Sequence, residues 1–580
     1  MVPHLTLKRV RWLLGLVIVV FVVFSLRLFQ VQGIDNKAYA AMARQVGTVT
    51  VDLPAPRGEI LDRNGVALAT TTNGLTITAD PSMTATNAPH IARILLEHLG
   101  DRIDYFETIE KLRKPDSKFA YLVRNVPEFE ARKAVDEIRE AGYPGIHTID
   151  QALRSYPGGE LAANLLGFID AEGVGQVGLE RLYNDQLSGK SGYQTYEISP
   201  KGQRIPMADT TGEEMVEGKD IRTTIDRELQ WYADQRVAQV AKESKANFAL
   251  AVTMDVKTCE IVQMSQAPTF NADTRTNISK EFTVNRAIEH VYEPGSVMKV
   301  FTMAALADQG KITADSKLKV PGTIRVDGFT ISDWWGHGTL NMTASGVIAQ
   351  SSNLGTVIAA RQMDNQTFYD YLRKFGFGGK TGMNFPGESN GIVRSPEQWI
   401  RSTHATTSFG QGVSVTAMQM VRALGSIAND GVMCTPQVVS STLDEDGKET
   451  PVDADPGKRV MSSKAASEVT RMMEAVVSEE GTARLAQIDG YRVAGKTGTA
   501  WRVNSETGRY VPGQYVLSFA GFAPADKPRF VTYVMIDKPK GGGGGSTAGP
   551  VFQDIMSMAL ERFGVPPTGA AKPEIAQYWD

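Results

Sequence analysis

The residue types that could do chemistry first meet in the segment "EPGSVMK", which holds Ser296 and Lys299. Pro294 and Gly295 end the preceding structure, and a helical pattern runs from Ser296 to Asp308. Residues three apart share one face of a helix, so the Lys299 amine is predicted to lie beside the Ser296 hydroxyl. A serine hydroxyl is a weak nucleophile unless a base takes its proton, and a neutral lysine can be that base. Considered alone, a serine after Pro-Gly is more often only a helix cap.

A lysine that acts as a base near neutral pH needs a lowered pKa, because the ordinary lysine pKa is about 10.4. Burial and a neighbouring cation can bring it to about 7–8. A second lysine from another part of the chain could be that cation, and one such residue, Lys496, stands in "KTGT" at 496–499. The two lysines would then form one site although they are far apart in the sequence.

The segment "SSN" at 351–353 is a third group with suitable side chains, and it separates two helical stretches. By itself it is an ordinary turn or cap. Beside Ser296, however, the hydroxyl of Ser351 could relay a proton and the amide of Asn353 could hold a substrate amide.

The segment "GYRVAGKT" at 490–497 also fits the G-x-x-x-x-G-K-[ST] pattern of a phosphate-binding loop. Such a loop needs a strand before its first glycine and a helix that starts at the Lys-Thr pair. Here "YRVA" alternates like a strand, and Gly498 directly after Thr497 is a poor start for a helix. Lys496 is therefore predicted to lie on a strand, and nucleotide binding is not expected.

The elements that must position these groups form an α/β pattern in residues 221–565. Strands enclosed by helices at both ends indicate a sheet domain with helical layers. Strands are expected at 248–256, 491–495, 515–523 and 529–537, and helices at 296–308, 343–350, 355–363, 464–478 and 551–562. The glycine run at 541–546 is interpreted as a flexible loop, and the tail at 566–580 as disordered.

The N-terminus carries a single apolar run, Trp12 to Phe29, preceded by Lys8, Arg9 and Arg11. A bilayer core of about 30 Å needs roughly 17–25 helical residues, so this run predicts a membrane anchor within residues 1–33. A cleaved signal peptide is the alternative, but its apolar region would usually be shorter. The basic residues before the run predict a cytoplasmic N-terminus, with the remaining chain outside.

Residues 34–220 mix α and β patterns and contain no set of catalytic groups, so a structural spacer or docking module is expected there. The chain of 580 residues has a net charge of −4, which gives no bias toward nucleic acid. Its histidines and cysteines show no metal-ligand spacing, and no metal or cofactor is expected. Cys259 and Cys434 could pair outside the cell, but two unpaired buried thiols are the favoured interpretation.

Taken in order, S-x-x-K, S-x-N and K-T-G resemble the signature of the penicillin-binding protein and serine β-lactamase superfamily. Longer segments strengthen the resemblance to class B penicillin-binding proteins, closest to the division-type members, from the anchor to about residue 562. It implies an antiparallel sheet covered by helices plus an all-helical subdomain, on an N-terminal α+β pedestal with one transmembrane helix. The segments that carry it are "APRGEILDRNG", "GQVGLERLYNDQLSGKSG", "FYDYLRKFGFGGKTGMNFPGE", "SFGQGVSVTAMQM" and "GTARLAQIDGYRVAGKTGTAW".

The resemblance also implies that the protein is a peptidoglycan D,D-transpeptidase that β-lactams inhibit covalently. It further implies a role for each matching residue. Ser296 would attack the penultimate D-Ala carbonyl of a stem peptide, with Lys299 as base and Ser351 assisting. The Asn353 side chain would hold a substrate amide, and Lys496 and Thr497 would bind the substrate carboxylate. Gly498 would leave room for the substrate along the strand. The backbone N–H groups of Ser296 and Thr499 would form the oxyanion hole.

Two other functions remain open on the same residues: a β-lactamase or β-lactam sensor, and a non-catalytic cell-wall scaffold. No E-x-x-L-N pattern, which would favour β-lactam hydrolysis, occurs between Asn353 and Lys496. The resemblance further implies a SEDS-family glycosyltransferase and other division proteins as partners of the anchor and pedestal. Elongation-type and sporulation-type relatives share this architecture. One departure from the family pattern is Thr258-Cys259, where Thr-Gly is usual.

Overall fold

The fold is described from a computed structural model, which covers residues 7–31, 48–197, 211–275, 278–503, 507 and 509–580. The chain divides into two compact units. The first comprises residues 1–56 with 189–217, and the second comprises residues 57–188 with 218–580.

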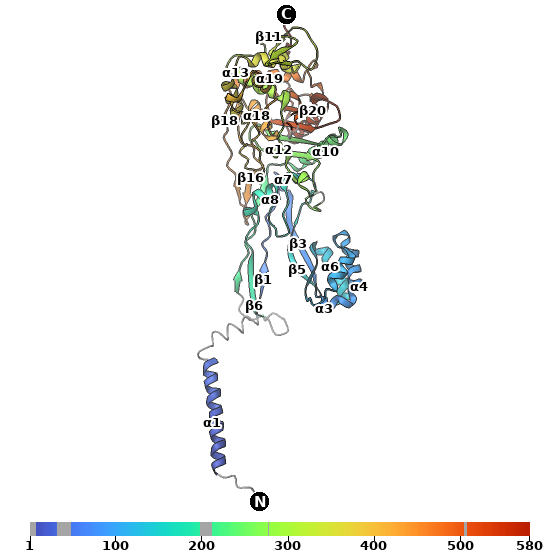
Figure 1. The fold of residues 1–580 in the computed structure, drawn as a ribbon, viewed down its shortest axis with the longest axis vertical. Helices are drawn as coiled ribbons and strands as arrows, with labels where there is room; N and C mark the ends of the chain where they lie inside the picture. The colour runs from blue at the N-terminus through green and yellow to red at the C-terminus, as the bar shows by residue number, and fades with distance from the viewer. Residues whose placement is uncertain (1–6, 32–47, 198–210, 276–277, 504–506, 508) are drawn as a thin grey trace. The chain divides into compact units, whose positions relative to one another are not determined.

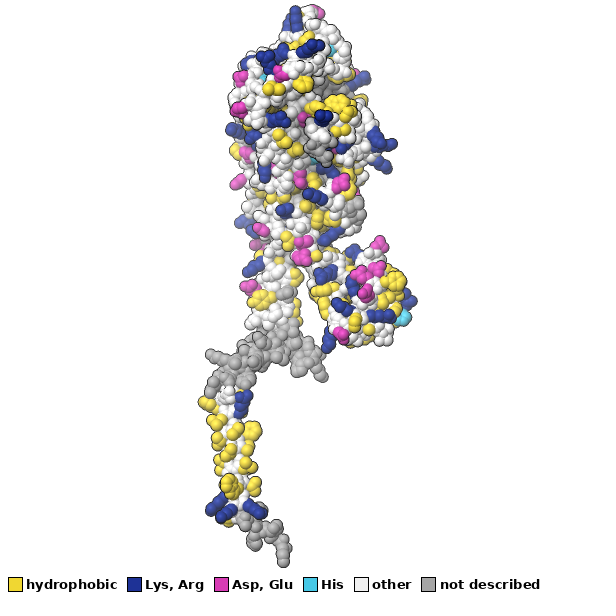
Figure 2. Space-filling view, viewed as in Figure 1, with side chains coloured by type: hydrophobic (Ala, Val, Ile, Leu, Met, Phe, Trp, Pro, Cys, Tyr) yellow, Lys and Arg dark blue, Asp and Glu magenta, His cyan; other side chains and the backbone are white. Residues whose placement is uncertain are grey.

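The first unit contains the helix α1, Leu7–Phe29, and a three-stranded antiparallel sheet in the order β1-β6-β7. Within the described part of the chain, α1 is the one helix long and apolar enough to cross a membrane. Hydrophobic side chains surround it, and basic side chains lie at its N-terminal turns (Figure 2). The helix starts five residues before the predicted apolar run. The strands are β1 Thr48–Leu53, β6 Gly192–Glu197 and β7 Thr211–Glu213.

The second unit begins with a small α+β lobe that has its own hydrophobic core. The strand β3 pairs antiparallel with both β4 and β5, and α4 and α6 pack beside these strands (Figure 1). Leu75 and Ile77 of β3 are buried against Leu95 of α4 and Val135 of α6. The elements are β3 Ala67–Ala79, α4 Ala88–Leu99, α5 Tyr105–Leu112, β4 Ala120–Pro127, α6 Glu128–Glu140 and β5 Ile146–Ser155.

A buried charge cluster holds together the chain segments that follow and precede this lobe. Glu180 accepts hydrogen bonds from Arg57 Nε at 2.6 Å and from Arg154 Nε at 2.7 Å. The Tyr156 hydroxyl donates to the same carboxylate at 3.2 Å. We call these four residues the Glu180 cluster. Its charges are paired within the fold, so its members act as structural links.

The large domain of the second unit is built on a five-stranded antiparallel sheet in the order β10-β9-β21-β20-β19. Every residue of β9 and β21 is buried, which shows that helices cover both faces. The helices α10 and α20 pack on the sheet and on each other, as do α18 and α19 (Figure 1). The strands are β9 Phe248–Asp255, β10 Ile261–Ala267, β19 Ala494–Val503, β20 Tyr510–Ala523 and β21 Phe530–Asp537.

Two of the three motifs lie on helices of this domain, S-x-x-K at the start of α13 and S-x-N at the start of α15. The bounds are α10 Arg227–Glu243, α13 Met298–Asp308, α14 Ala344–Ala349, α15 Asn353–Ala360, α16 Asn365–Lys374, α17 Arg401–Ser408, α18 Ala417–Ala428, α19 Ser463–Val476 and α20 Gly549–Arg562. The predicted fold class is confirmed, and Lys496 lies on the strand β19 as predicted. The strand starts at Ala494, three residues later than the sequence predicts.

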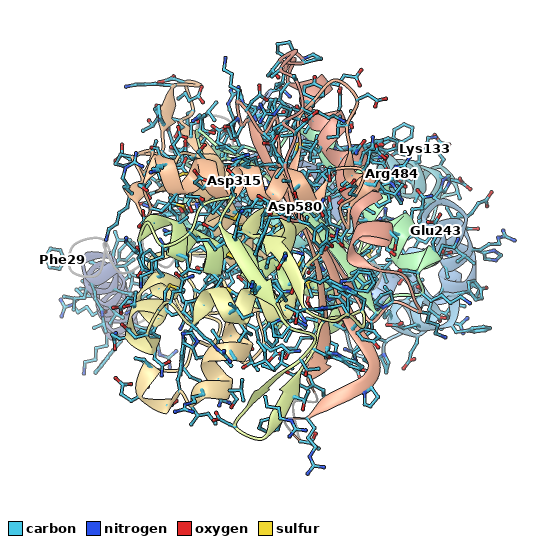
Figure 3. All side chains as sticks on the ribbon, turned by 90° about the horizontal axis from the view of Figure 1, so that it is seen from above. Phe29, Lys133, Glu243, Asp315, Arg484 and Asp580 are labelled. Carbon is cyan, nitrogen blue, oxygen red and sulfur yellow. A yellow bond between two sulfur atoms is a disulfide. The ribbon has the colours of Figure 1, made fainter. Side chains whose placement is uncertain are left out.

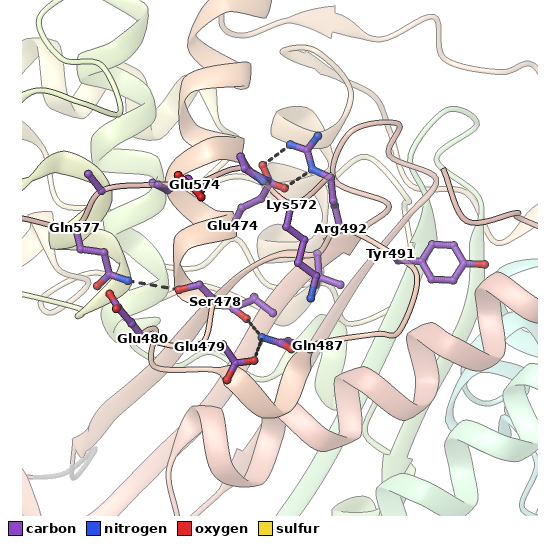
Figure 4. Close-up of a pocket in the computed structure, with 15 residues that line it drawn as sticks. Glu474, Ser478, Glu479, Glu480, Gln487, Tyr491, Arg492, Lys572, Glu574 and Gln577 are labelled. Atoms are coloured by element: carbon purple, nitrogen blue, oxygen red, sulfur yellow. Dashed lines mark hydrogen bonds and ion pairs between the residues drawn. The ribbon is translucent and has the colours of Figure 1, made fainter. Parts of the chain in front are cut away.

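The C-terminal tail corrects one prediction. The backbone N–H of Thr343 donates to Gln577 at 3.0 Å, and the N–H of Trp579 donates to Asn341 at 3.1 Å. The last residues therefore lie along β14, Leu340–Thr343, and Figure 3 labels Asp580 at this end of the domain. The tail and α19 line a cavity of about 650 Å³, and Figure 4 shows the side chains around it. The prediction of a disordered tail is wrong for these residues.

Two smaller predictions are also corrected. Cys259 and Cys434 are joined in a disulfide, with 6.2 Å between their Cα atoms, where the sequence favours unpaired thiols. Cys259 has a φ of +59°, so a cysteine occupies the turn conformation that the usual glycine adopts freely. In the glycine run, Gly544 is buried in a helical turn that precedes α20. A Cβ there would lie 2.7 Å from the Gly498 oxygen, so this part of the run is packed against β19.

Candidate active site

Ser296 lies in the short 3-10 turn Gly295–Val297 that leads into α13. Gly295 has a φ of +54°, and a Cβ at this position would lie 2.8 Å from the Thr499 oxygen of β19. Only glycine therefore allows the turn to approach the strand this closely. The approach is tight on the strand side as well, since a Cβ on Gly498 would lie 2.9 Å from Val297. The fold thus brings the predicted nucleophile and the K-T-G strand together.

Two lysine amines converge on one hydroxyl. The Nζ atom of Lys496 lies 2.9 Å from Ser351 Oγ, and the Nζ atom of Lys299 lies 3.3 Å from the same oxygen. Lys299 also donates to the Ser351 carbonyl at 2.5 Å, and Lys496 to the Thr497 carbonyl at 2.9 Å. Both lysines are fully buried. The partners of both amines are neutral oxygens, and none of the carboxylates in the described part of the chain forms an ion pair with either lysine.

Burial without an ion-pair partner changes the protonation of these amines. It lowers the pKa of Lys299 to about 7, although the charge of Asp333 acts to raise it. The pKa of Lys496 is also well below its ordinary value, first because of burial and then because of the charge on Lys299. The value for Lys299 agrees with the predicted 7–8. Of the two predicted causes, burial lowers this pKa, and the charge of Lys496 does not contribute.

Asp333 is a functional candidate that the sequence analysis missed. Its carboxylate accepts hydrogen bonds from Ser352 Oγ at 2.6 Å and from the Leu354 N–H at 3.0 Å. The Asn353 side chain donates to the carbonyl of Ser332, the residue before Asp333, at 3.1 Å. Asp333 therefore holds the residues on both sides of Asn353. It stands in a loop between two short strands, where no periodic pattern singles it out.

Ser351 itself has a strained backbone, with a φ of +57°. Such a conformation costs a non-glycine residue about 1–3 kcal/mol and persists only where its surroundings impose it. Here the N–H of Ser352 donates to the Val347 carbonyl at 2.9 Å, closing the turn between α14 and α15. The strain is stored where the Ser351 hydroxyl meets the two lysines.

The structure places the other predicted residues as follows. Thr497 is nearly buried, and its hydroxyl lies 3.2 Å from Lys496 Nζ. Thr499 is exposed on β19, and Ser296 and Asn353 are half-buried. Because β19 is the last strand of its sheet, its outer edge is free to pair with an extended ligand. No group of His, Cys, Asp or Glu side chains in the described ranges has a metal-binding arrangement.

Comparison with known proteins supports the same assignment. Residues 249–557 match the family model "Penicillin binding protein transpeptidase domain", and residues 52–223 match "Penicillin-binding Protein dimerisation domain". The penicillin-binding protein PbpB of Mycolicibacterium smegmatis is 35% identical over 95% of this chain and 89% of its own length. Peptidoglycan D,D-transpeptidase FtsI of Escherichia coli K12 is 31% identical over 88% of this chain and 84% of its own.

Solved structures agree with these matches. Penicillin-binding protein 3 of Mycobacterium tuberculosis, in complex with aztreonam, has a TM-score of 0.71 and 32% identity. It covers 91% of this chain, and this chain covers all of it. A peptidoglycan synthetase from Bifidobacterium adolescentis has a TM-score of 0.72 and 31% identity over 92% of this chain. The chain therefore belongs to the penicillin-binding proteins that combine a dimerisation domain with a transpeptidase domain.

Proposed function

We propose that this protein is a peptidoglycan D,D-transpeptidase that cross-links stem peptides through an acyl-enzyme on Ser296. The observation that carries the proposal is the convergence of two buried lysine amines on the Ser351 hydroxyl. One amine belongs to Lys299, one helical turn after Ser296, and the other to the strand beside Ser296. This arrangement supplies a base for the nucleophile and a second amine for an anionic substrate group.

In the acylation step, the Ser296 oxygen attacks the penultimate D-Ala carbonyl while its proton passes to the Lys299 amine. The N–H groups of Ser296 and Thr499 stabilise the oxyanion of the tetrahedral intermediate, and each such donor contributes about 3–4 kcal/mol. The C–N bond then breaks, and the leaving D-Ala amine takes the proton that Lys299 had received, with Ser351 as relay. The product is an ester between Ser296 and the donor peptide.

Substrate binding prepares the base for this step. The terminal carboxylate of the stem peptide binds at Lys496 and Thr497, and the negative charge favours the ammonium form of Lys496. The ammonium of Lys496 in turn favours the neutral amine on Lys299. The free protein, in which both lysine pKa values are lowered, would thus gain an ordered pair with one charged and one neutral amine.

In the second step, an amine of a neighbouring stem peptide attacks the ester carbonyl. A neutral Lys299 removes a proton from that amine, and the Ser296 oxygen leaves and takes a proton back. The substrate lies along the outer edge of β19, and the Asn353 amide holds a peptide group. The space beside Gly498, which the sequence assigns to the substrate, is taken by Ser518 and Val297. β-Lactams, which carry a strained amide and a carboxylate, would acylate Ser296 in the same way.

Labelling with a fluorescent penicillin tests the proposal. The wild type should form a covalent adduct on the peptide that contains Ser296, and Ser296→Ala should abolish it. An adduct on another side chain would contradict the assignment. Rapid hydrolysis of the adduct would favour a β-lactamase or sensor. A Ser296→Ala variant that retains its cellular role would favour a non-catalytic scaffold.

Location and partners form a separate part of the proposal. Lys8, Arg9 and Arg11 in the first turns of α1 favour a cytoplasmic N-terminus, one crossing by α1 and an outward transpeptidase domain. We infer a pedestal in residues 34–220 and a place at the division septum from the resemblance to division-type penicillin-binding proteins. A SEDS-family glycosyltransferase and other division proteins would bind the anchor and pedestal. Exchanging α1 for an unrelated transmembrane helix should abolish co-purification of such a glycosyltransferase while penicillin labelling persists. If the glycosyltransferase still co-purifies, α1 is not part of the interface.

A further inference from the structure

A group of three aromatic rings lies beside the S-x-N motif, with Trp334 exposed, Trp335 half-buried and the His337 side chain buried. Residues 332–338, here called the tryptophan loop, connect the strands β13, Phe329–Ile331, and β14. Trp334 is 70% exposed, and its ring meets that of Trp335 at 62° with 5.1 Å between centroids. The Trp335 and His337 rings are 5.1 Å apart at 34°. An exposed cluster of large aromatic side chains is uncommon and usually marks a binding surface.

The tryptophan loop is anchored to the catalytic residues. The indole N–H of Trp334 donates to the carbonyl of Gln350, the residue before Ser351, at 3.0 Å. The His337 ring lies 3.0 Å from the Asp333 carboxylate, which also binds Ser352. Because the Trp334 bond uses the polar edge of its ring, the exposed apolar surface of that ring remains available, whereas the His337 side chain is buried against Trp335 and Asp333. A ligand on that exposed surface would lie next to the Ser296 cleft.

The hollow in front of the rings has a neutral lining. It is a shallow, open hollow of about 650 Å³ between the tryptophan loop and residues 321–323. Thr323 and Ser332 supply exposed hydroxyl groups, and the one carboxylate, Asp333, is buried and already hydrogen-bonded. A stem peptide carries carboxylates and would need cationic partners, which this lining lacks. A neutral ligand with both C–H faces and hydroxyl groups fits better.

We propose that the tryptophan loop is a saccharide subsite, which binds a neutral N-acetylhexosamine ring of the glycan strand that carries the donor stem peptide. The angled indole rings contact the C–H face of the sugar, and Thr323 and Ser332 bind its hydroxyl or acetamido groups. The subsite rests on the proposed function, because it names a part of the same substrate. It would select peptides that are attached to glycan over free peptides.

Saccharide binding to the full-length protein in detergent tests the subsite directly. The probe is the β-1,4-linked tetramer of N-acetylglucosamine, followed by protein-observed NMR or calorimetry. The wild type should bind it, Trp335→Ala should bind at least about tenfold more weakly, and Trp335→Tyr should recover most of the affinity. Trp231→Ala is the matched control, since Trp231 is 60% exposed but lies on α10. No binding by the wild type, or equal losses in both alanine variants, would overturn the subsite.

A cross-linking assay separates the subsite from the proposed function. The wild type should use a donor that carries its disaccharide with a higher kcat/KM than the free stem peptide, and Trp335→Ala should lose this preference. Penicillin acylation of Trp335→Ala should fall far less than its saccharide affinity. Equal losses in both would assign the loop to positioning of the S-x-N motif and overturn the subsite. Saccharide binding without penicillin acylation in the wild type would instead refute the proposed function alone.

Discussion

Two regions of this protein bury charged side chains, and they treat those charges in opposite ways. In the Glu180 cluster, one carboxylate lies between two arginines at 2.6 and 2.7 Å, so opposite charges meet directly. In the active site, Lys299 and Lys496 are fully buried with neutral oxygens as partners. A paired buried charge keeps its ionisation and links chain segments, whereas an unpaired one is driven to lose its charge.

The comparison shows how one chain makes either a structural link or a reactive group from buried ionisable residues. Arginine is always charged and fits a carboxylate with a fixed fork of donors, which suits a permanent link. Lysine changes its pKa readily on burial, which suits a base. The two sites therefore differ in what removal of a charge should do, and this difference can be measured.

The largest effect is expected for Lys299→Met, which removes the base but fills the same space. Penicillin acylation should fall about 10²–10⁴-fold, the usual contribution of a general base. The melting temperature should stay the same or rise, because a buried amine without an ion pair is replaced by an apolar side chain. A large drop in melting temperature would mean that the amine stabilises the fold, as charges in the Glu180 cluster do.

Glu180→Gln should have the opposite profile, because it leaves two buried arginines without their counter-charge. Breaking a buried ion pair by removing one partner costs about 3–5 kcal/mol, so calorimetry should show a clear loss of melting temperature. Glu479→Gln is the matched control, since Glu479 pairs with Arg484 at an exposed site. It should leave the melting temperature nearly unchanged. Equal changes in melting temperature for the two variants would show that the buried ion pairs of Glu180 stabilise the fold no more than an exposed one.

The pH dependence of stability should distinguish the lysine pair from the arginine cluster. The folded-state pKa of Lys299 is about 7 and the ordinary value about 10.5, so the unfolded chain binds more protons between these values. Stability should therefore increase with pH across this window, by up to about 1.4 kcal/mol per pH unit for one lysine. Denaturant unfolding of wild type and Lys299→Met between pH 7 and 9 measures it, and the variant should show a smaller slope. Identical slopes would contradict the lowered pKa.

The sequence shows the lysine pair but not Asp333, the carboxylate that holds the residues on both sides of Asn353, and the reason is physical. S-x-x-K and K-T-G are local patterns, and the strand alternation around Lys496 places it correctly on β19. The role of Asp333 depends on its hydrogen bond to Ser352, which joins two separate loops. A contact between loops leaves no periodic pattern in the sequence. The Cys259–Cys434 disulfide likewise joins positions 175 apart.

The order of the C-terminal tail is hard to predict from sequence for a similar reason. Its Pro, Gly and Ala residues suggest disorder, but its docking depends on the open edge of β14. The backbone N–H groups of Thr343 and Trp579 bind at this edge, and the side chains of the same two residues donate to the carbonyls of Ala576 and Met342. These contacts join residues more than 200 positions apart, so they leave no local pattern in the sequence. Composition therefore predicts the intrinsic preference of the tail and not the strand edge that overrides it.

The smallest expected effect is that of Asp333→Asn, which keeps the shape but removes a negative charge near the lysines. The charge of Asp333 raises the pKa of Lys299, so its loss should lower that pKa further. Neutral Lys299 is the active form, and acylation in the wild type should rise with pH through about 7. In the variant, this acid limb should move to lower pH. The maximal rate should fall about tenfold, or about 1.4 kcal/mol, as the hold on Ser352 and Leu354 weakens.

Stopped-flow acylation by a chromogenic β-lactam from pH 5 to 9 separates these two effects. A limb that shifts without loss of maximal rate would assign Asp333 to electrostatics alone, and a loss of rate without a shift would assign it to positioning alone. Ser332→Ala is the control, because Ser332 contacts Asn353 through its backbone carbonyl and its hydroxyl is not part of that contact. A shift of the acid limb to higher pH would contradict this prediction, because it would show that Asp333 lowers the pKa of Lys299 and favours the neutral amine. The carboxylate would then act on the lysine pair in the opposite sense to that in which Glu180 acts on its arginines.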